Sequence, residues 1–419
     1  MKILVIGSGG REHAIIRKLS ESKRISHLYC APGNGGISKL ATCVNIKATD
    51  IEAVVAFSKS EKIDMVFVAP DDPLALGMVD ALEANGIKAF GPRKSAAVLE
   101  ASKAFSKQLM KEYHIPTASY EIFENIDEAI LYLDTQKMPV VIKADGLALG
   151  KGVIIAETHE EAVKACQEMM SEHKFGDSGK KIVIEEFMKG KEVTVLAFTD
   201  GKTVYPMISS QDHKRAYDND EGLNTGGMGA FSPSRAYTDK INEICEREIF
   251  IPTIKAMEKM GRPFKGVIYF GLMLTDDGPK VVEYNARFGD PETQVILPLL
   301  KNDLVDIMEA IIEERLDEIT LEWETGACAC IVLASGGYPV SYEKGYEIKG
   351  IEHAEEMDDV IVFHAGTKEE HGIIVTNGGR VLGVTAKGKD LSSAIARAYQ
   401  AVEKISFKDM HYRKDIGNK

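Results

Sequence analysis

The chain has 419 residues, which is too long for one hydrophobic core, so two or three domains are expected. Its 44% of hydrophobic and 27% of charged residues are usual for globular proteins and exclude a disordered chain. The formal net charge of −13 argues against nucleic acid or an anionic membrane surface as a partner, because both are polyanions.

Apolar strand segments alternate with helical stretches over the first hundred residues. Strands are expected at residues 3–6, 27–31, 65–70 and 88–92, with helices at 11–23, from Asp50 and around 74–85. This βαβα order predicts a Rossmann-like parallel sheet covered by helices, in a domain of residues 1–101.

Longer and more often paired strands are expected in the middle of the chain. Residues 140–145, 153–157 and 181–187 predict strands, and Asp277-Gly278 predicts a hairpin. The mixture indicates an α+β domain over residues 102–325, and a smaller α+β domain follows at 326–419. The chain is thus a multidomain protein of α/β and α+β type.

The first glycine loop, residues 7–13, follows a strand and opens a helix, which suits an anion. A dinucleotide is disfavoured, because Glu12 occupies the third glycine position and no acid lies between Glu21 and Asp50. A sugar phosphate fits better, although a tight turn without a ligand is an alternative. A second loop, residues 32–36, follows the next strand and favours a site. The candidate residues are Gly9, Gly10, Arg11, Glu12, Gly33 and Asn34.

The second glycine loop places Lys143 at the end of a strand, followed by Gly146, Gly150, Lys151 and Gly152. Its spacing differs from a Walker A loop, and it suits a lysine-bearing flap that closes over a polyphosphate. The alternative is a flexible hairpin with solvated lysines. Downstream residues favour ATP, because an extended backbone can pair with adenine and an acid can bind the ribose. These residues are Glu185, Glu186, Phe187 and Glu192.

Glu283 and Asn285 are two apart on a predicted strand, so both side chains project from one face. Their oxygens suit Mg²⁺, which takes few protein ligands and completes its shell with substrate and water oxygens. A solvated strand face is the alternative. The charges of Arg287, Asp290 and Glu292 close by favour the metal site.

Together these segments resemble the ATP-grasp superfamily, and most closely its glycinamide ribonucleotide synthetase family. The resemblance runs over the whole chain in order. The matching runs are GGREHA (9–14), APGN (31–34), SKAF (102–105), KADGLALGKGV (143–153), IEEF (184–187), QDHKR (211–215), NTGGMGA (224–230), EYNARFGDPETQ (283–294), HAGT (364–367), TNGGRVL (376–382) and RKDIG (413–417).

The resemblance implies an ATP-grasp central domain with a mobile lid at about 120–190. It implies a carbon–nitrogen ligase of de novo purine (IMP) biosynthesis that joins glycine to 5-phosphoribosylamine with ATP, through glycyl phosphate. It adds Lys103 to the ATP residues and implies Mg²⁺ or Mn²⁺ on Glu283 and Asn285. The catalytic candidates are Arg287, Asp212, Asp290 and Lys214, with Asp212 or Asp290 on the ammonium of glycine.

Two departures from the family pattern stand out. Asp71 and Asp72 occupy a segment in which relatives carry a glutamate, so whether this segment contacts the substrate stays an open question. Leu223 replaces a proline of the family pattern. Without a targeting or membrane segment, a cytoplasmic monomer acting on small molecules is expected. The rival functions are an ATP-grasp carboxylase, a nicotinamide oxidoreductase and a nucleotide sensor without catalysis.

Overall fold

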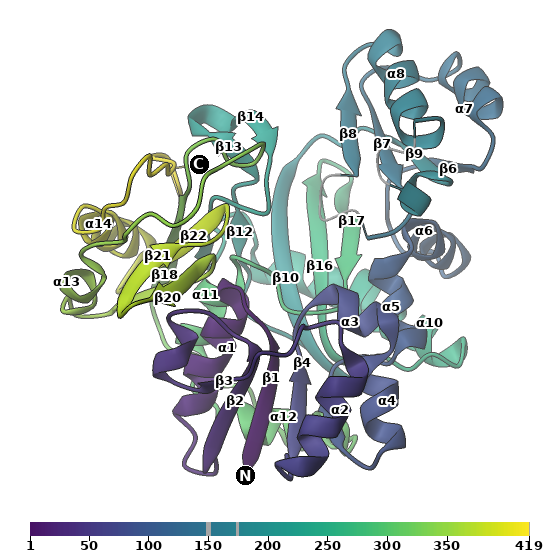
Figure 1. Cartoon of the computed structure of the whole chain (residues 1–419). Coiled ribbons are helices and arrows are strands. Elements are labelled where there is room, and N and C mark those ends of the chain that lie inside the picture. The colour runs from purple at the N-terminus through teal and green to yellow at the C-terminus, as the bar shows by residue number, and fades with distance from the viewer. Residues whose placement is uncertain (148–151, 173–175, 419) are drawn as a thin grey trace.

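The computed structural model describes residues 1–147, 152–172 and 176–418. In this part of the chain the strands form four larger sheets and two short hairpins, with helices packed against the sheets (Figure 1). No helix among the described residues has the length and apolar character needed to cross a membrane.

The N-terminal sheet is parallel and has the strand order β3-β2-β1-β4-β5. Its strands are β1 (Lys2–Gly7), β2 (His27–Pro32), β3 (Thr42–Cys43), β4 (Met65–Val68) and β5 (Lys88–Phe90). Its helices are α1 (Gly10–Ser20), α2 (Ile51–Ser60), α3 (Asp71–Leu76), α4 (Met78–Ala84) and α5 (Lys94–Ala101). The predicted parallel sheet is confirmed. The strand order reverses between β1 and β4, which is where ligands bind in sheets of this kind.

A small antiparallel sheet, here called the lid sheet, has the strand order β6-β9-β7-β8. Its elements are β6 (Tyr120–Phe123), α7 (Ile126–Leu133), β7 (Val140–Ala144), β8 (Val153–Ala156), α8 (His159–Met170) and β9 (Ile182–Glu186). The two helices pack against the sheet around a separate apolar core (Figure 1). Helix α6 (Lys103–Glu112) precedes the lid sheet in the chain.

The central sheet is antiparallel, with the order β11-β10-β16-β17. Its elements are β10 (Lys191–Asp200), β11 (Val204–Pro206), α9 (Asp239–Cys245), α10 (Ile251–Lys259), β16 (Lys265–Thr275), β17 (Gly278–Asn285) and α12 (Leu304–Ile312). The predicted hairpin is present, but its turn residues are Asp276 and Asp277, because Gly278 already pairs with Thr275. The turn therefore begins one residue earlier than predicted.

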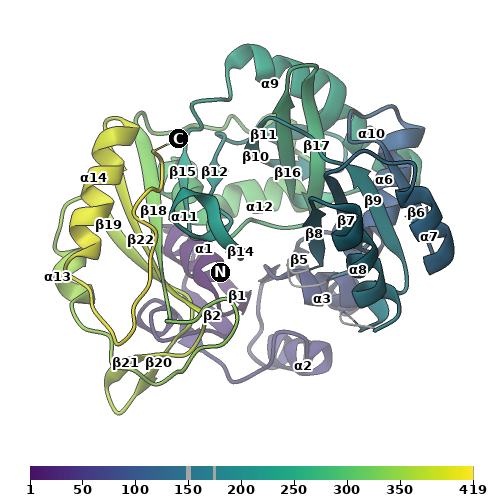
Figure 2. The same cartoon turned by 90° about the horizontal axis from the view of Figure 1, so that it is seen from above.

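The C-terminal sheet is antiparallel and has the order β12-β15-β18-β22-β19. Its elements are β12 (Gln211–Asp212), β15 (Gly229–Ser232), β18 (Ala327–Ala334), α13 (Ile351–Glu355), β19 (Val360–His364), β22 (Arg380–Gly388) and α14 (Leu391–Val402). A hairpin of β20 (Thr367–Glu370) and β21 (Ile373–Thr376) lies beside it. Two strands from the middle of the chain thus join a sheet built mainly by its end, on the opposite side from the lid sheet (Figure 2).

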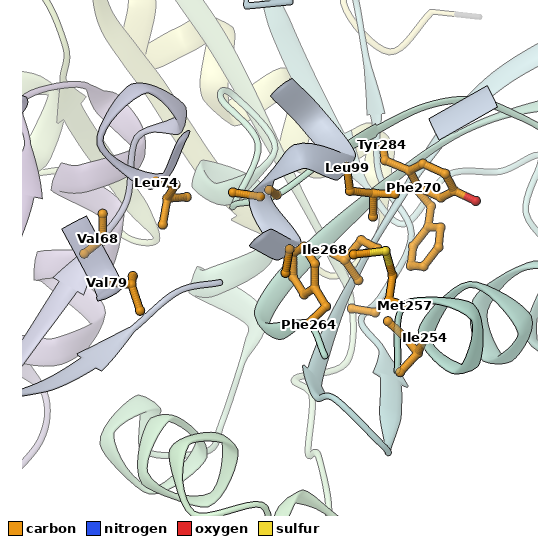
Figure 3. Packing of buried hydrophobic residues seen from close by; sticks show 14 of the residues in the cluster. Val68, Leu74, Val79, Leu99, Ile254, Met257, Phe264, Ile268, Phe270 and Tyr284 are labelled. Atoms are coloured by element: carbon orange, nitrogen blue, oxygen red, sulfur yellow. The ribbon is translucent and has the colours of Figure 1, made fainter. Parts of the chain in front are cut away.

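One apolar core joins the N-terminal and central sheets. Val68 and Leu74 from the first unit belong to the same buried cluster as Ile268 and Phe270 of β16 (Figure 3). The two backbones also approach closely, since a Cβ at Gly266 would lie 3.2 Å from the Cα of Gly91. This shared core fixes the loops after β1 and β4 relative to the strands of the central sheet.

Candidate active site

Glu283 and Asn285 lie on β17 and project from the same face of the central sheet. Gly271 of β16 pairs with Glu283, and a Cβ at Gly271 would lie 3.2 Å from Glu283 Cγ, so the glycine leaves room for the carboxylate. Among the described residues no three His, Cys, Asp or Glu side chains are grouped closely enough to hold a metal. A carboxylate and an amide oxygen fit Mg²⁺ when the substrate and water supply the other ligands.

Four cations, here called the cation cluster, surround Glu283. Burial raises the pKa of Glu283, but the charges of Lys214, Lys143, Lys103 and Arg287 outweigh burial and lower it. Lys214 Nζ lies 3.8 Å from Glu283 Oε1. The fold therefore brings residues predicted to bind ATP and to act in catalysis to the predicted metal ligand.

Lys143 lies at the end of β7 and points toward the central sheet. Its Nζ is 2.9 Å from Glu185 Oε1 on β9 and donates to the carbonyl of Val282 at 3.1 Å. The other carboxylate oxygen, Glu185 Oε2, lies 2.9 Å from Nζ of Lys107 on α6. All three charged side chains are buried, so they form a compact ion-paired group beneath the lid sheet.

The two residues after Glu185 have different surroundings. Glu186 is exposed and accepts a hydrogen bond from the backbone N–H of Ser119 at 3.0 Å. Phe187 is half-buried and follows the end of β9. The backbone N–H of Glu186 already donates to the carbonyl of Ser119 at 3.0 Å, and the adenine contact of this segment stays a prediction.

The glycine flap starts from a defined turn. Lys103 Nζ donates to the carbonyl of Gly146 at 2.9 Å, and Gly146 has a φ of +128°, which favours glycine. The carbonyl of Gly152 accepts a backbone hydrogen bond from the last residue of β7 at 2.8 Å. Gly150 and Lys151 lie outside the described residues.

Lys214 stands among acids. It is ion-paired with Glu192 and lies close to Asp212 of β12. Burial raises the pKa of Asp212 to about 8; Lys214 opposes this rise, whereas Glu292, Glu192 and Glu283 add to it. The acids around Lys214 outnumber it, so this part of the site favours a further cation.

Arg287 follows β17 and connects the central sheet to the first unit. Its Nη2 lies 2.7 Å from Glu100 Oε1 on α5 and 4.0 Å from Asp71 Oδ2 at the start of α3. The buried Nε of Arg287 has no hydrogen-bond partner among the described residues, so a donor remains available for a ligand. Burial raises the pKa of Asp71, but Arg287 and Arg11 lower it overall, whereas Asp72 is exposed.

The two predicted phosphate loops lie against each other. The backbone N–H of Gly33 donates to the carbonyl of Gly7 at 3.0 Å. The side-chain amide of Asn34 donates to the carbonyls of Ser8 at 2.8 Å and His364 at 2.9 Å. A residue of the C-terminal unit therefore helps to fix both loops.

Glu12 holds the first loop from inside. Its Oε2 accepts from the N–H of Gly9 at 2.5 Å, and its Oε1 pairs with Arg11 Nε at 2.6 Å. Glu12 is only 2% exposed, so it shapes the start of α1. Gly10 is tightly packed, because a Cβ there would lie 2.6 Å from Gln294 Nε2 on α11 (Thr293–Ile296).

Asp290 is the meeting point of three parts of the chain. Gln294 donates to Asp290 Oδ1 at 2.7 Å, and Arg380 Nη2 of β22 lies 3.3 Å from Asp290 Oδ2. Arg380 also donates to the carbonyls of Gly226 and Asp290, both at 2.7 Å. Gly227 has a φ of +114°, and a Cβ there would lie 2.5 Å from a ring carbon of Pro291.

Three residues of this arrangement were missed as candidates from the sequence: Lys107, Glu100 and Arg380. Lys107 lies one helical turn after Lys103, and Arg380 lies within the run TNGGRVL. The sequence therefore contains a weak indication that both residues belong to the site. Glu100 carried none, because a single acid on a helix is usually solvated. Within the described part of the chain, the side chain of Glu186 bonds to the N–H of Ser119 and not to the cation cluster.

The chain matches three models of one family along its length. They are the N domain (residues 1–100), the ATP-grasp (A) domain (101–293) and the C domain (328–419) of phosphoribosylglycinamide synthetase. A phosphoribosylamine–glycine ligase of Halalkalibacterium halodurans is 51% identical over 419 residues, covering 100% of this chain and 97% of the relative. One from Caldanaerobacter subterraneus subsp. tengcongensis is 50% identical over 417 residues, covering 99% of each.

Solved structures agree with these matches. The phosphoribosylamine–glycine ligase of Thermotoga maritima has a TM-score of 0.88 at 32% identity, covering 100% of both chains. A biotin carboxylase domain of the Hydrogenobacter thermophilus 2-oxoglutarate carboxylase, in complex with MgADP, has a TM-score of 0.75 at 18% identity. It covers 98% of this chain and 91% of that chain, and it shows a shared fold.

Proposed function

The chain belongs to the phosphoribosylglycinamide synthetase family, and from that premise we propose how its residues divide the work of an ATP-dependent phosphoribosylamine–glycine ligase. This carbon–nitrogen ligase acts in purine biosynthesis and joins glycine to 5-phosphoribosylamine, giving glycinamide ribonucleotide, ADP and phosphate. We propose residues 1–101 as the sugar-phosphate unit, 102–325 as the nucleotide unit with a mobile lid at 120–190, and 326–419 as the third unit.

The nucleotide is proposed to lie between the lid sheet and β17. Lys103 and Lys143 neutralise its phosphates, with Lys151 of the flap as a third cation. Adenine and ribose are assigned to the segment from Glu185 to Glu192. The observation that carries this proposal is the cation cluster around an ionised Glu283. Phosphoryl transfer requires mainly positioning and neutralisation of charge, and the cluster is suited to both.

The divalent cation is proposed to be Mg²⁺ or Mn²⁺, held by Glu283 and Asn285. When bound, it would neutralise charge that develops on the transferred phosphoryl group. Gly271 leaves the space that a carboxylate ligand needs, and the lowered pKa of Glu283 keeps it ionised.

The sugar phosphate is assigned to the loops after β1 and β2. The residues assigned to it are Gly9, Gly10, Arg11, Gly33 and Asn34. The N–H groups of Gly9 and Gly33 already donate to Glu12 and to the carbonyl of Gly7, so the proposal relies on Gly10 and on the guanidinium of Arg11 for donors. The loop after β1 lies at the switch point of the parallel sheet, which supports this choice. Glu12 contributes indirectly, since it fixes the loop from inside.

Glycine is proposed to bind between the two sites. Two acids were considered for the ammonium of glycine. Asp212 is favoured, because a further positive charge there would reduce the repulsion among Asp212, Glu292, Glu192 and Glu283. Asp290 is already paired with Arg380 and Gln294. The orphan Nε of Arg287 would donate to the carboxylate of glycine as it attacks the γ-phosphate.

The resulting glycyl phosphate is attacked by the amine of phosphoribosylamine, which forms the new C–N bond and releases phosphate. Acyl phosphates hydrolyse readily, so closure of the lid is proposed to exclude water. We further propose that the enzyme works in the cytoplasm as a monomer on these small molecules, without nucleic acid or membrane, which size-exclusion chromatography against its mass of 45.9 kDa can test.

The direct test is release of ADP with each substrate omitted in turn. ADP release should require both glycine and phosphoribosylamine. Release that depends on bicarbonate instead would point to the carboxylases that share the fold and would overturn the assignment.

A further inference from the structure

Lys107 is a buried cation that the reaction scheme does not use. It lies on α6, is 2% exposed, and places its Nζ 2.9 Å from Glu185 Oε2. It also donates to Thr117 Oγ1 at 2.7 Å. Burial lowers the pKa of Lys107 to about 8, although Glu185 opposes this, so its burial carries a cost that the ion pair offsets.

Glu185 therefore has two counter-ions, one on each oxygen. Lys143 Nζ lies 2.9 Å from Oε1, as Lys107 does from Oε2. Both lysines are also tied to β17, Lys143 through the carbonyl of Val282 and Lys107 through Thr117, whose hydroxyl donates to the carbonyl of Val281 at 2.7 Å. The group thus joins α6 and the lid sheet to the strand that carries Glu283.

Lys107 and Lys143 are expected to behave differently when a nucleotide binds. A polyphosphate in the proposed nucleotide site would draw Lys143 toward its oxygens and away from Glu185. Glu185 is only 3% exposed, and a buried carboxylate without a counter-ion is strongly unfavourable. Lys107 pairs with the other carboxylate oxygen, Oε2, and also donates to Thr117. It can therefore stay with Glu185 when Lys143 moves to the phosphate.

We propose that Lys107 is a positioning residue for nucleotide binding: it holds the side chain of Glu185 in place while Lys143 exchanges Glu185 for a phosphate group. The proposal rests on the proposed nucleotide site. Under this proposal Lys107 contributes to the affinity for ATP, and the cation cluster acts in the chemical step. The proposal also explains why a second lysine is buried beside Glu185.

The test is a double-mutant cycle on ATP affinity. ATP is titrated into the full-length protein by calorimetry, and steady-state kinetics are measured with Lys107→Met, Glu185→Gln and the double variant. Lys107→Met should weaken ATP binding by about 10-fold or more, the value expected for losing a charged hydrogen bond, while kcat at saturating ATP changes less than about threefold. In the Glu185→Gln background the same change should have no further effect, because there is no carboxylate left to hold.

A matched control is Lys111→Met, on the same helix. Lys111 is exposed, and its Nζ lies 5.8 Å from the ring centre of Tyr120, compared with 5.7 Å for Lys107. Lys111→Met should bind ATP like the wild type. Circular dichroism and thermal melting check that each variant is folded; without ATP, Lys143 still pairs with Glu185 in Lys107→Met, so this variant should fold.

Two results would overturn the proposal. One is wild-type ATP affinity in Lys107→Met, and the other is an equal loss with and without Glu185. Lys143→Met separates the causes of failure. If Lys143→Met loses ATP while Lys107→Met keeps it, only the role of Lys107 is wrong. If both keep ATP, the nucleotide binds elsewhere and the proposed site fails with it.

Discussion

Replacing Glu283 with Gln tests the proposed metal strand most directly. The variant keeps the shape of the side chain opposite Gly271 and removes one negative charge. At 3.8 Å from Lys214, with an effective dielectric constant of about 20, the gross Coulomb energy is about 4 kcal/mol. Both side chains are about one-third exposed (30% and 32%), so solvent screening reduces this to about 1–2 kcal/mol. Lys214 keeps its pairing with Glu192, and the protein should remain folded.

The effect on activity should be larger than the effect on stability. Loss of one charged ligand contact is worth about 1.5–3 kcal/mol, which raises the Mg²⁺ concentration for half-maximal activity about 10- to 150-fold. The assay is release of ADP with glycine and phosphoribosylamine at increasing Mg²⁺. The control is Asp277→Asn, an acid-to-amide change in the turn of the same hairpin, where the side chain is 85% exposed. An unchanged Mg²⁺ requirement in Glu283→Gln would refute the metal assignment.

Three further predictions concern the rest of the site. Gly227→Ala should lower the free energy of unfolding by about 1–3 kcal/mol and raise KM for phosphoribosylamine, because its Cβ would overlap Pro291. An unchanged Tm would contradict this. Arg287→Lys should lower kcat about 100-fold with KM for ATP nearly unchanged, and a purely KM effect would count against its role in transfer. Burial lowers the pKa of His13 to about 3 and of His364 to about 4. Unfolding therefore takes up protons below pH 6.5, and stability should fall by about 2 kcal/mol per imidazole at pH 5. His13→Asn should flatten the fall of Tm with acid, and an unchanged slope would argue against this origin.

The parallel sheet could be predicted from the sequence because each strand is a continuous apolar run followed by a helix. The period of a strand also predicted that Glu283 and Asn285 share a face. The pairing of β15 with β18 could not be predicted. It joins residues 229–232 to residues 328–331, and strands of four residues carry too little pattern to specify a distant partner.

The site residues divide in the same way. Lys143 was predicted because a glycine loop follows it directly. Its pairing with Glu185 depends on the register of β7 against β9, in which Val141 lies opposite Glu185, and no local motif encodes that register. Lys107 and Arg380 act through contacts with residues far along the chain, so their roles appear only when the sheets are assembled.

Gly10 of the first glycine loop and Gly226 of the run NTGGMGA are explained by packing. In the first loop, a Cβ at Gly10 would meet Gln294 of the central unit at 2.6 Å. In the loop before β15, Gly226 lies against the guanidinium of Arg380, whose Cζ would be 3.0 Å from a Cβ there. These glycines allow three units to approach one another around Asp290. A larger residue at either position would move the proposed sugar-phosphate loops away from the cation cluster, and a ligase must hold its two reacting substrates within contact distance.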